Sequence, residues 1–109
     1  MALKHARAAE PVDLSPLGTR LQEARTEAIV KSSSFEAVRL VVRAGTVIPT
    51  HKVPGQITLH CLEGRVEISL DDSSLELGPN EWVYLDGGEP HSVRGIEDSS
   101  LLLTILLVT

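Results

Sequence analysis

Short runs of alternating apolar and polar residues, separated by turn-forming residues, are the feature that most limits what this chain can fold into. The clearest example is RVEISL at 65–70, which places Val66, Ile68 and Leu70 on one face, followed by SLEL at 74–77. The intervening Asp and Ser residues favour a turn, so the whole segment predicts a half-buried β-hairpin. The sequence shows no helical pattern long enough to alternate with strands, which argues against an α/β fold.

Eight or nine strand-like runs of this kind recur along the chain, each bounded by Gly, Pro, Asn, Asp or Ser. The clearest lie at 26–31, 35–45, 57–63, 65–70, 74–77, 82–85, 91–95 and 101–109. Closely spaced short strands predict an all-β sandwich or barrel of jelly-roll type. The last run, LLLTILLVT, is too short for a membrane span of about 20 residues, and it predicts a strand buried on both faces.

The first part of the chain is predicted to lie outside this barrel. We assign residues 1–24 to an N-terminal arm, partly disordered or forming a short helix, and residues 25–109 to the barrel domain. Residues 1–12 are mixed polar and alanine-rich, which is typical of a poorly ordered terminus. Ser15-Pro16 has the form of a helix start, with Ser as the N-cap and Pro as the first helical residue.

The charge and cysteine content limit the partners and the compartment. The net charge is −5, and the ten Lys and Arg residues are scattered rather than clustered. Phosphate neutralisation needs clustered basic residues, so a nucleic-acid partner is not expected. One cysteine cannot form an internal disulfide, and the first ten residues hold no apolar signal region. We therefore expect a cytoplasmic protein that does not associate with membranes.

Two motifs in the chain resemble those of the cupin superfamily, in its small single-domain bacterial form. The family motifs run G(x)5HxH(x)3-4E(x)6G and G(x)5PxG(x)2H(x)3N, and this sequence matches parts of both. The matching positions are Gly45, His51, Gly64, Gly88, Pro90 and His91. The resemblance covers roughly residues 35–108. It implies a double-stranded β-helix barrel, and in many members the motif His and Glu side chains bind a divalent metal.

The departures from these motifs bear directly on function. Val53 stands at the second histidine position and Ile57 at the glutamate position, and neither side chain can bind a metal. Asp86 replaces the usual proline and Gly95 the usual asparagine. A divalent ion usually takes at least three protein ligands with a satisfied second shell. The resemblance therefore implies a reduced metal site.

His51 and His91 remain as the candidate metal ligands, and the resemblance implies that both face the barrel interior. They would hold iron, nickel, manganese or zinc, with Gln56, His60 or water completing the sphere. The alternative is a pair of histidines left from a metal-binding ancestor, hydrogen-bonded and inert. Gln56 has an alternative too, as a solvated residue of the Pro54-Gly55 turn.

The strand at 57–63, ITLHCLE, has two faces whose orientation decides the role of His60. Ile57, Leu59 and Cys61 share one face, while Thr58, His60 and Leu62 share the other. If Ile57 occupies the family ligand position, its face is the interior and His60 points outward. A shift of register would instead bring His60 to His51 and His91. In the unshifted register Cys61 lines the barrel as a small hydrophobe.

The predicted ligand pocket combines these residues with one aromatic side chain. Its members are His51, Gln56, Cys61, Trp82 and His91. Trp82 and Tyr84 share a face of their strand, which would wall a pocket or a dimer interface, or simply pack in the core.

Three functional interpretations stay open. The leading one is a barrel that binds a small molecule with a reduced or absent metal site. The alternatives are a metal-dependent oxygenase or isomerase, and a structural or regulatory module acting through a dimer surface. We expect a homodimer, because pairing would hide apolar surface that a chain of 109 residues leaves exposed. The fold alone does not choose among these functions.

Overall fold

Nine β-strands and one short 3-10 helix, η1, account for the regular structure of residues 5–108, the part of the chain that the computed structural model describes. Helix η1 spans Gly18–Glu23. The strands are β1 (Glu27–Lys31), β2 (Phe35–Val42), β3 (Val47–His51), β4 (Ile57–Glu63), β5 (Val66–Ser69), β6 (Ser74–Leu77), β7 (Trp82–Leu85), β8 (His91–Gly95) and β9 (Ser99–Leu106).

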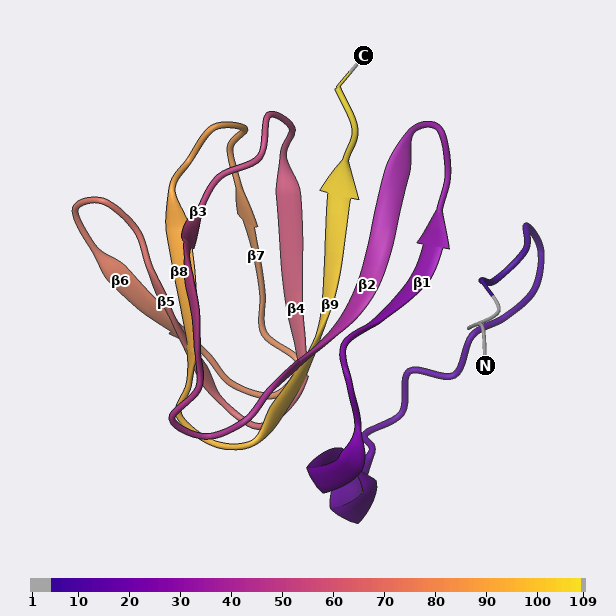
Figure 1. Ribbon diagram of the computed structural model, residues 1–109, viewed down its shortest axis with the longest axis horizontal. Helices are drawn as coiled ribbons and strands as arrows, with labels where there is room; N and C mark the ends of the chain where they lie inside the picture. Colours follow the sequence, from indigo (N-terminus) through magenta and orange to yellow (C-terminus); the bar gives the residue numbers. More distant parts are fainter. Residues whose placement is uncertain (1–4, 109) are drawn as a thin grey trace.

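The strands form two sheets that face each other (Figure 1). The larger sheet has five strands in the order β1-β2-β9-β4-β7, and the smaller has four in the order β3-β8-β5-β6. Neighbouring strands pair antiparallel in both sheets. Strands far apart in sequence therefore lie side by side, as β2 does with β9. The predicted all-β jelly-roll barrel is confirmed.

The core is one cluster of mostly aliphatic side chains contributed by both sheets. Its buried members are Val42, Ile57, Leu59, Cys61, Val66, Ile68, Leu77, Leu85, Val93 and Leu101. These side chains follow the period-two pattern, because alternate residues of a strand point to the same face. On β4 the buried positions are Ile57, Leu59 and Cys61. The interior face of this strand is therefore the one predicted from its alternation.

The structure adds one strand that was not predicted and moves the limits of the last strand. Residues 47–51 form β3, which was not predicted, and β9 begins at Ser99 rather than at residue 101. Strand β9 is also not buried on both faces. Leu101 is fully buried, but Leu102 is half-buried and Leu106 is 45% exposed. The reason is that one face of β9 points away from the smaller sheet, so only the other face is covered by the core.

The predicted helix start at Ser15-Pro16 is wrong by a few residues. The backbone N–H and the hydroxyl of Ser15 both donate to the carboxylate of Asp13. The Ser15 side chain is therefore not available as an N-cap, and η1 begins at Gly18 after Leu17, with no side-chain cap. Of the predicted arm, residues 1–4 lie outside the described residues, and the Ala6 N–H donates to the Ile29 carbonyl of β1.

Glu63, at the end of β4, fastens the arm to the barrel. Its carboxylate accepts hydrogen bonds from the backbone N–H of Leu17 at 2.9 Å, the N–H of Gly18 at 3.1 Å and the Ser100 hydroxyl. The Arg39 guanidinium lies 3.6 Å from the same carboxylate, and both side chains are largely buried. One acidic side chain thus joins the start of η1 to two strands of the larger sheet.

Arg43, just after β2, holds the other end of η1. Its guanidinium donates to the carbonyls of Gln22 at 2.6 Å and Ala24 at 2.8 Å. The last carbonyls of a helix have no partner within the helix, so a cation at this end satisfies them. Leu21, within η1, is buried. The helix is therefore tied to the barrel at both ends.

The arm's attachment is expected to weaken in acid. Burial acts to raise the pKa of Glu63, but the hydrogen bonds from Leu17, Ser100 and Gly18, together with the charge of Arg39, outweigh it and lower the pKa. A lowered folded-state pKa means that the ionised carboxylate stabilises the folded state at neutral pH. That contribution is lost as the pH falls from about 4.3, the usual value for an unfolded Glu, through the lowered pKa.

We therefore predict that the free energy of unfolding falls as the pH drops below about 4.3, and that part of this slope disappears in a Glu63→Gln variant. Urea unfolding followed by circular dichroism at a series of pH values measures both. Hydrogen bonds from Ser15 lower the pKa of the Asp13 carboxyl, so this group changes stability with pH in the same direction. An Asp13→Asn variant therefore serves as the comparison for the pH slope. An unchanged slope in Glu63→Gln would show that this carboxylate does not couple to folding.

No helix among residues 5–108 has the length and apolar character needed to cross a membrane.

Candidate functional site

His51, which is exposed, and His91, which is buried, lie side by side in the smaller sheet. They are directly paired residues of β3 and β8 in the smaller sheet, and their ring centroids are 4.4 Å apart with planes tilted by 56°. Directly paired residues of an antiparallel ladder point to the same face. The two histidines that match the family motifs are thus brought together by strand pairing.

A break in the ladder between β3 and β8 sets the position of His51. The register shifts between Ile48 and His51, and Pro49 lies in the shifted segment. Proline has no N–H to give to a ladder, so it favours a bulge, and a bulge re-aims the side chains beside it. The sequence Pro-Thr-His thereby turns the His51 ring toward His91.

In both rings, Nδ1 lies within hydrogen-bond distance of a backbone carbonyl oxygen. His51 Nδ1 is 3.0 Å from the Pro49 carbonyl oxygen, and His91 Nδ1 is 3.0 Å from the Glu89 carbonyl oxygen. A carbonyl oxygen only accepts, so each Nδ1 must carry the hydrogen that is donated. In a neutral imidazole the other nitrogen, Nε2, then keeps its lone pair. Each ring, when neutral, therefore keeps Nε2 as a hydrogen-bond acceptor.

The two histidines border a small apolar cavity of about 90 Å³ between the two sheets. Besides the two histidines, its lining consists of Leu40, Ile48, Leu59, Val93 and Leu103. His91 is only 5% exposed, whereas His51 is an exposed residue. An apolar cavity with a few convergent polar groups is the usual form of a small-molecule site.

Three of the five predicted pocket residues lie outside this cavity. Gln56 is exposed in the turn before β4, where its carbonyl accepts from the Leu106 N–H at 2.9 Å. Trp82 is 57% exposed, because its pairing with His60 puts it on the outer face of the larger sheet. Cys61 is fully buried in the core, one inward position further along β4 than Leu59. Of the predicted pocket residues, this cavity brings together His51 and His91.

Cys61 behaves as a core residue in the structure. Its sulfur lies 3.4 Å from the Glu63 carbonyl oxygen and 3.6 Å from that of Gly64, to which the thiol donates weakly. Burial raises the pKa of the Cys61 thiol, which favours the protonated form. A protonated, buried thiol is neither a nucleophile nor a metal ligand.

His60 does not join the other two histidines. It is half-buried and pairs with Leu102 of β9 and Trp82 of β7, on the outer face of the larger sheet. The unshifted register of β4 is therefore the observed one. Across residues 5–108 no group of three or more His, Cys, Asp or Glu side chains is placed to hold a metal ion. Two imidazoles alone are fewer protein ligands than a zinc or iron site usually has.

The aliphatic lining of the cavity was not singled out by sequence reasoning. Leu40, Leu59 and Leu103 come from three adjacent strands of the larger sheet, and each lies at an inward position of its strand. Strand parity gives their direction but not their distance from the histidines. That distance follows from the packing of the two sheets, which a sequence pattern does not contain.

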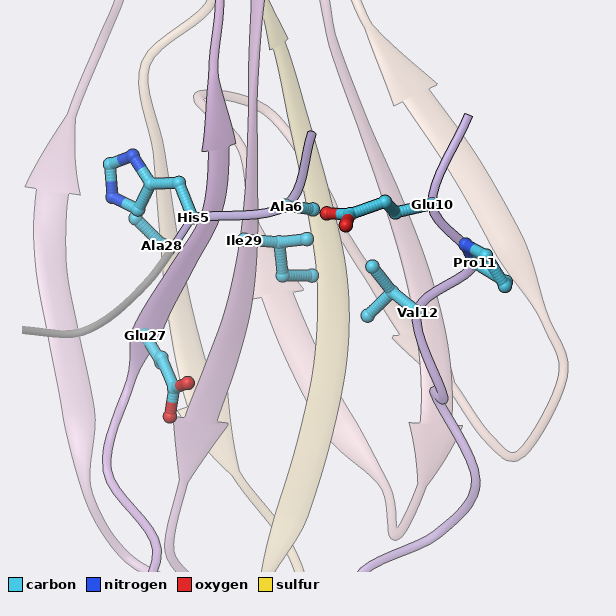
Figure 2. Close-up of a pocket in the computed structure, with 8 residues that line it drawn as sticks. All are labelled: His5, Ala6, Glu10, Pro11, Val12, Glu27, Ala28 and Ile29. Atoms are coloured by element: carbon cyan, nitrogen blue, oxygen red, sulfur yellow. The ribbon is translucent and has the colours of Figure 1, made fainter. Parts of the chain in front are cut away.

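Other cavities in the described residues lack this convergence. One of about 490 Å³ lies between the N-terminal arm and β1 (Figure 2). Its polar side chains, His5, Glu10 and Glu27, are spread around the cavity rather than directed at one point (Figure 2). A cavity of about 220 Å³ is lined by Lys52, Val53, Pro54 and Gly88. These residues lie in the loop that follows β3 and the loop that precedes β8.

Comparisons with known proteins agree on the fold. A conserved protein of unknown function from Streptococcus pyogenes is 19% identical with a TM-score of 0.77, covering 100% of this chain and 99% of that one. A cupin superfamily protein from Desulfitobacterium hafniense is 18% identical with a TM-score of 0.78, covering 99% and 100%. An RmlC-like cupin protein from Desulfovibrio desulfuricans is 24% identical with a TM-score of 0.69, covering 96% and 97%. At these identities the likeness shows a shared fold alone.

Sequence comparison supplies the family. No curated protein matches the sequence. The family model described as a cupin domain matches residues 38–108, which is more than half of the chain and includes both histidines of the site. The chain therefore belongs to the cupin family.

Proposed function

We propose that this cupin binds a small molecule in the barrel cavity, and that the ligand donates hydrogen bonds to Nε2 of His51 and His91. The observation that carries the proposal is the pair of Nδ1 contacts to backbone carbonyls, which leaves both Nε2 atoms as acceptors. A ligand with an O–H or N–H group satisfies them, whereas a carboxylate brings only further acceptors. The ligand class is therefore a small, largely apolar alcohol or amine.

The size of the cavity limits the part of the ligand that it encloses. A volume of about 90 Å³ is well below the roughly 300–1,000 Å³ of sites for drug-sized ligands. A water molecule takes about 30 Å³ in the liquid, so the cavity has room for a group of only a few heavy atoms. Aliphatic walls from both sheets would pack against the carbon chain of that group.

Three matched probes test this chemistry: 1-propanol, propylamine and propionate. They share a three-carbon chain and differ only in the polar group. Long-range nitrogen–proton NMR spectra of the imidazoles report the tautomer of each ring and any contact at Nε2. We expect both rings to carry the hydrogen on Nδ1, and we expect the alcohol and the amine, but not the carboxylate, to shift the Nε2 signals of His51 and His91.

Single-residue variants test whether the probes bind at His51 and His91. His51→Ala or His91→Ala is expected to weaken probe binding at least tenfold, because each removes one of the two acceptors. His60→Ala removes a histidine from the outer face of the same barrel and is expected to leave binding unchanged. Hydrogen on Nε2 in both rings, or equal binding by the His91→Ala variant, would contradict the proposal.

One observation favours a second candidate, a metal-dependent cupin enzyme of the oxygenase or isomerase class. Histidines that bind metals commonly donate their other ring N–H to a carbonyl or carboxylate, as both rings do in this site. The two imidazoles would have to be supplemented by water or by the bound molecule. Elemental analysis of untagged protein after incubation with iron, nickel, manganese or zinc tests this candidate. Near-stoichiometric metal that is lost in the His51→Ala and His91→Ala variants would favour it over the first.

A further inference from the structure

Two loops at one end of the barrel, each adjoining one histidine of the site, form the walls of a second cavity. The first loop follows His51, the last residue of β3, and the second precedes His91, the first residue of β8. Both loops lie at the same end of the barrel (Figure 1). The Gly88 N–H donates to the Val53 carbonyl at 2.8 Å, which joins the two loops. We call the cavity of about 220 Å³ between them the loop cavity; it is lined by Lys52, Val53, Pro54 and Gly88.

The loop cavity and the 90 Å³ cavity of the histidine pair, here called the histidine cavity, are lined by consecutive residues. Lys52 lines the first and His51 the second, and the Cα atoms of consecutive residues are about 3.8 Å apart. On the other loop, the Glu89 carbonyl contacts His91 Nδ1, and the residue before it, Gly88, lines the loop cavity. Since His51 is exposed and His91 is buried, solvent reaches the pair from the side of His51, where Lys52 follows.

The volumes of the two cavities indicate where the rest of a ligand lies. The histidine cavity of about 90 Å³ has room for only a few heavy atoms. The loop cavity is more than twice as large, and together the two cavities reach the lower end of the roughly 300–1,000 Å³ that small-molecule sites enclose. A ligand whose polar end occupies the histidine cavity therefore has space for its remaining atoms in the loop cavity.

The loop cavity offers an apolar wall and one positive charge. Val53 is half-buried and packs against the hydrophobic core, and Pro54 adds a second apolar side chain. Lys52 is the charged residue of the lining, and it makes no ion pair with a carboxylate of residues 5–108. Asp86 and Glu89 of the facing loop do not line the cavity. The loop cavity therefore suits a carbon chain that ends in a negative charge.

The single charge of Lys52 matches a carboxylate better than a phosphate. A lysine ammonium is a compact unit charge with three N–H donors. A carboxylate is a monoanion, so one ammonium neutralises it, whereas a phosphate monoester carries about −1.5 to −2 charges at neutral pH. In a chain whose net charge is −5, the excess negative charge of a phosphate would be repelled.

We propose that the loop cavity binds a carboxylate at the far end of the ligand, which makes the ligand an ω-hydroxy or ω-amino acid. The hydroxyl or amine donates to the histidine pair, the carbon chain packs against Val53 and Pro54, and the carboxylate pairs with Lys52. This inference rests on the proposed function, because the histidines hold the donor end. Propionate has the carboxylate but no donor group for Nε2, so its expected failure to shift the Nε2 signals follows from the same arrangement.

A matched series of ligands separates the two ends. It consists of the n-alcohols of three to six carbons and the ω-hydroxy acids with the same numbers of carbons. Titration of the Nε2 signals of His51 and His91 gives a dissociation constant for each. The shortest hydroxy acid is expected to bind no better than its alcohol, because its carboxylate would be drawn toward the apolar histidine cavity. At the length that lets the carboxylate reach Lys52, we expect the acid to bind about fivefold more tightly than its alcohol, the gain of a favourable exposed ion pair.

A charge-removing variant assigns that gain to Lys52. Lys52→Met keeps an unbranched apolar side chain and removes the ammonium, so it is expected to reduce the affinity for the hydroxy acid to that for the alcohol, while alcohol binding stays unchanged. Lys31→Met is the matched control, because Lys31 lies on β1 of the other sheet and pairs with Glu36. It is expected to bind both ligands as the wild type does. Added salt is expected to weaken binding of the hydroxy acid but not of the alcohol.

Each contrary result has a distinct meaning. If the alcohols shift the Nε2 signals but no hydroxy acid binds more tightly than its alcohol, the carboxylate subsite is wrong and the proposed function stands. The same conclusion holds if the gain persists in Lys52→Met, since another group must then bind the carboxylate. If neither the alcohols nor the hydroxy acids shift the Nε2 signals, the proposed function fails and this inference fails with it.

Discussion

Replacing Gly64 by alanine is expected to lower the free energy of unfolding by about 3 kcal/mol or more. Gly64 has a φ of +84°, where a side chain costs about 1–2 kcal/mol. A Cβ there would also lie 2.3 Å from the Asp98 carbonyl oxygen and 2.8 Å from the Ser99 Cα. Backbone atoms cannot move aside as a flexible side chain does, so overpacking adds about 1–3 kcal/mol. Urea unfolding followed by circular dichroism measures the loss.

Gly45 provides the matched control for this change. Its φ of +79° is nearly the same, but an added Cβ meets no atom within 4 Å. Gly45→Ala therefore carries the backbone cost alone and is expected to lose about 1–2 kcal/mol. An equal loss in the two variants would show that the close approach of Asp98 and Ser99 adds nothing to the cost of a side chain at residue 64.

Replacing Glu63 by alanine is expected to cost about 3 kcal/mol and to free the start of η1. The change leaves the N–H groups of Leu17 and Gly18 without their acceptor, and it leaves the buried Arg39 guanidinium without its counter-charge. Removing one partner of a buried ion pair costs about 3–5 kcal/mol, and slight exposure puts this pair at the low end. Arg39 Nε already lacks a hydrogen-bond partner, so little can compensate.

Two measurements separate the effects of Glu63→Ala. Urea unfolding gives the loss of stability, and amide hydrogen exchange gives the protection of Leu17 and Gly18, which we expect to disappear. Glu67→Ala is the control, because Glu67 pairs with Arg94 at 3.2 Å in a more exposed position. Exposed ion pairs contribute about 0–1 kcal/mol. Similar losses in the two variants would argue that Glu63 does not anchor the arm.

Stability and function are separated along β4. The two residues with the largest predicted effects lie at the end of this strand and the turn after it, where they join the strand to the arm and to β9. The cavity lies nearer the middle, at Leu59. Because distant, independent sites are usually additive, His51→Ala and His91→Ala should alter ligand binding without the losses expected at Glu63 and Gly64.

Four strands, β4, β6, β7 and β8, were predicted with their observed limits, because turn-forming residues bound these short runs. Strand β5 was predicted at 65–70 and spans Val66–Ser69. Strand β3 escaped prediction because VIPTH contains a proline and does not alternate, and its pairing with β8 is interrupted by a shift of register. Proline is tolerated there because the interrupted ladder does not need its missing N–H.

The candidate site could be predicted only in part. The family motifs pointed to His51 and His91, and strand parity placed Ile57 inward and His60 outward, as observed. The same parity argument could not place Trp82, because the motifs do not reveal which face of β7 meets the core. Pairing of Trp82 with the outward His60 settles that face.

The amino-acid sequence by itself determined most of the strands, most of the turns and the two histidines that match the family motifs. These depend on period, turn chemistry and motif spacing, all of which are readable over a few residues. Only the tertiary structure decided that the two imidazoles stand 4.4 Å apart, that both Nδ1 atoms are taken by carbonyls, and that Trp82 and Tyr84 face outward. The physical reason is that these facts depend on pairing between strands distant in sequence, and on how closely two sheets pack.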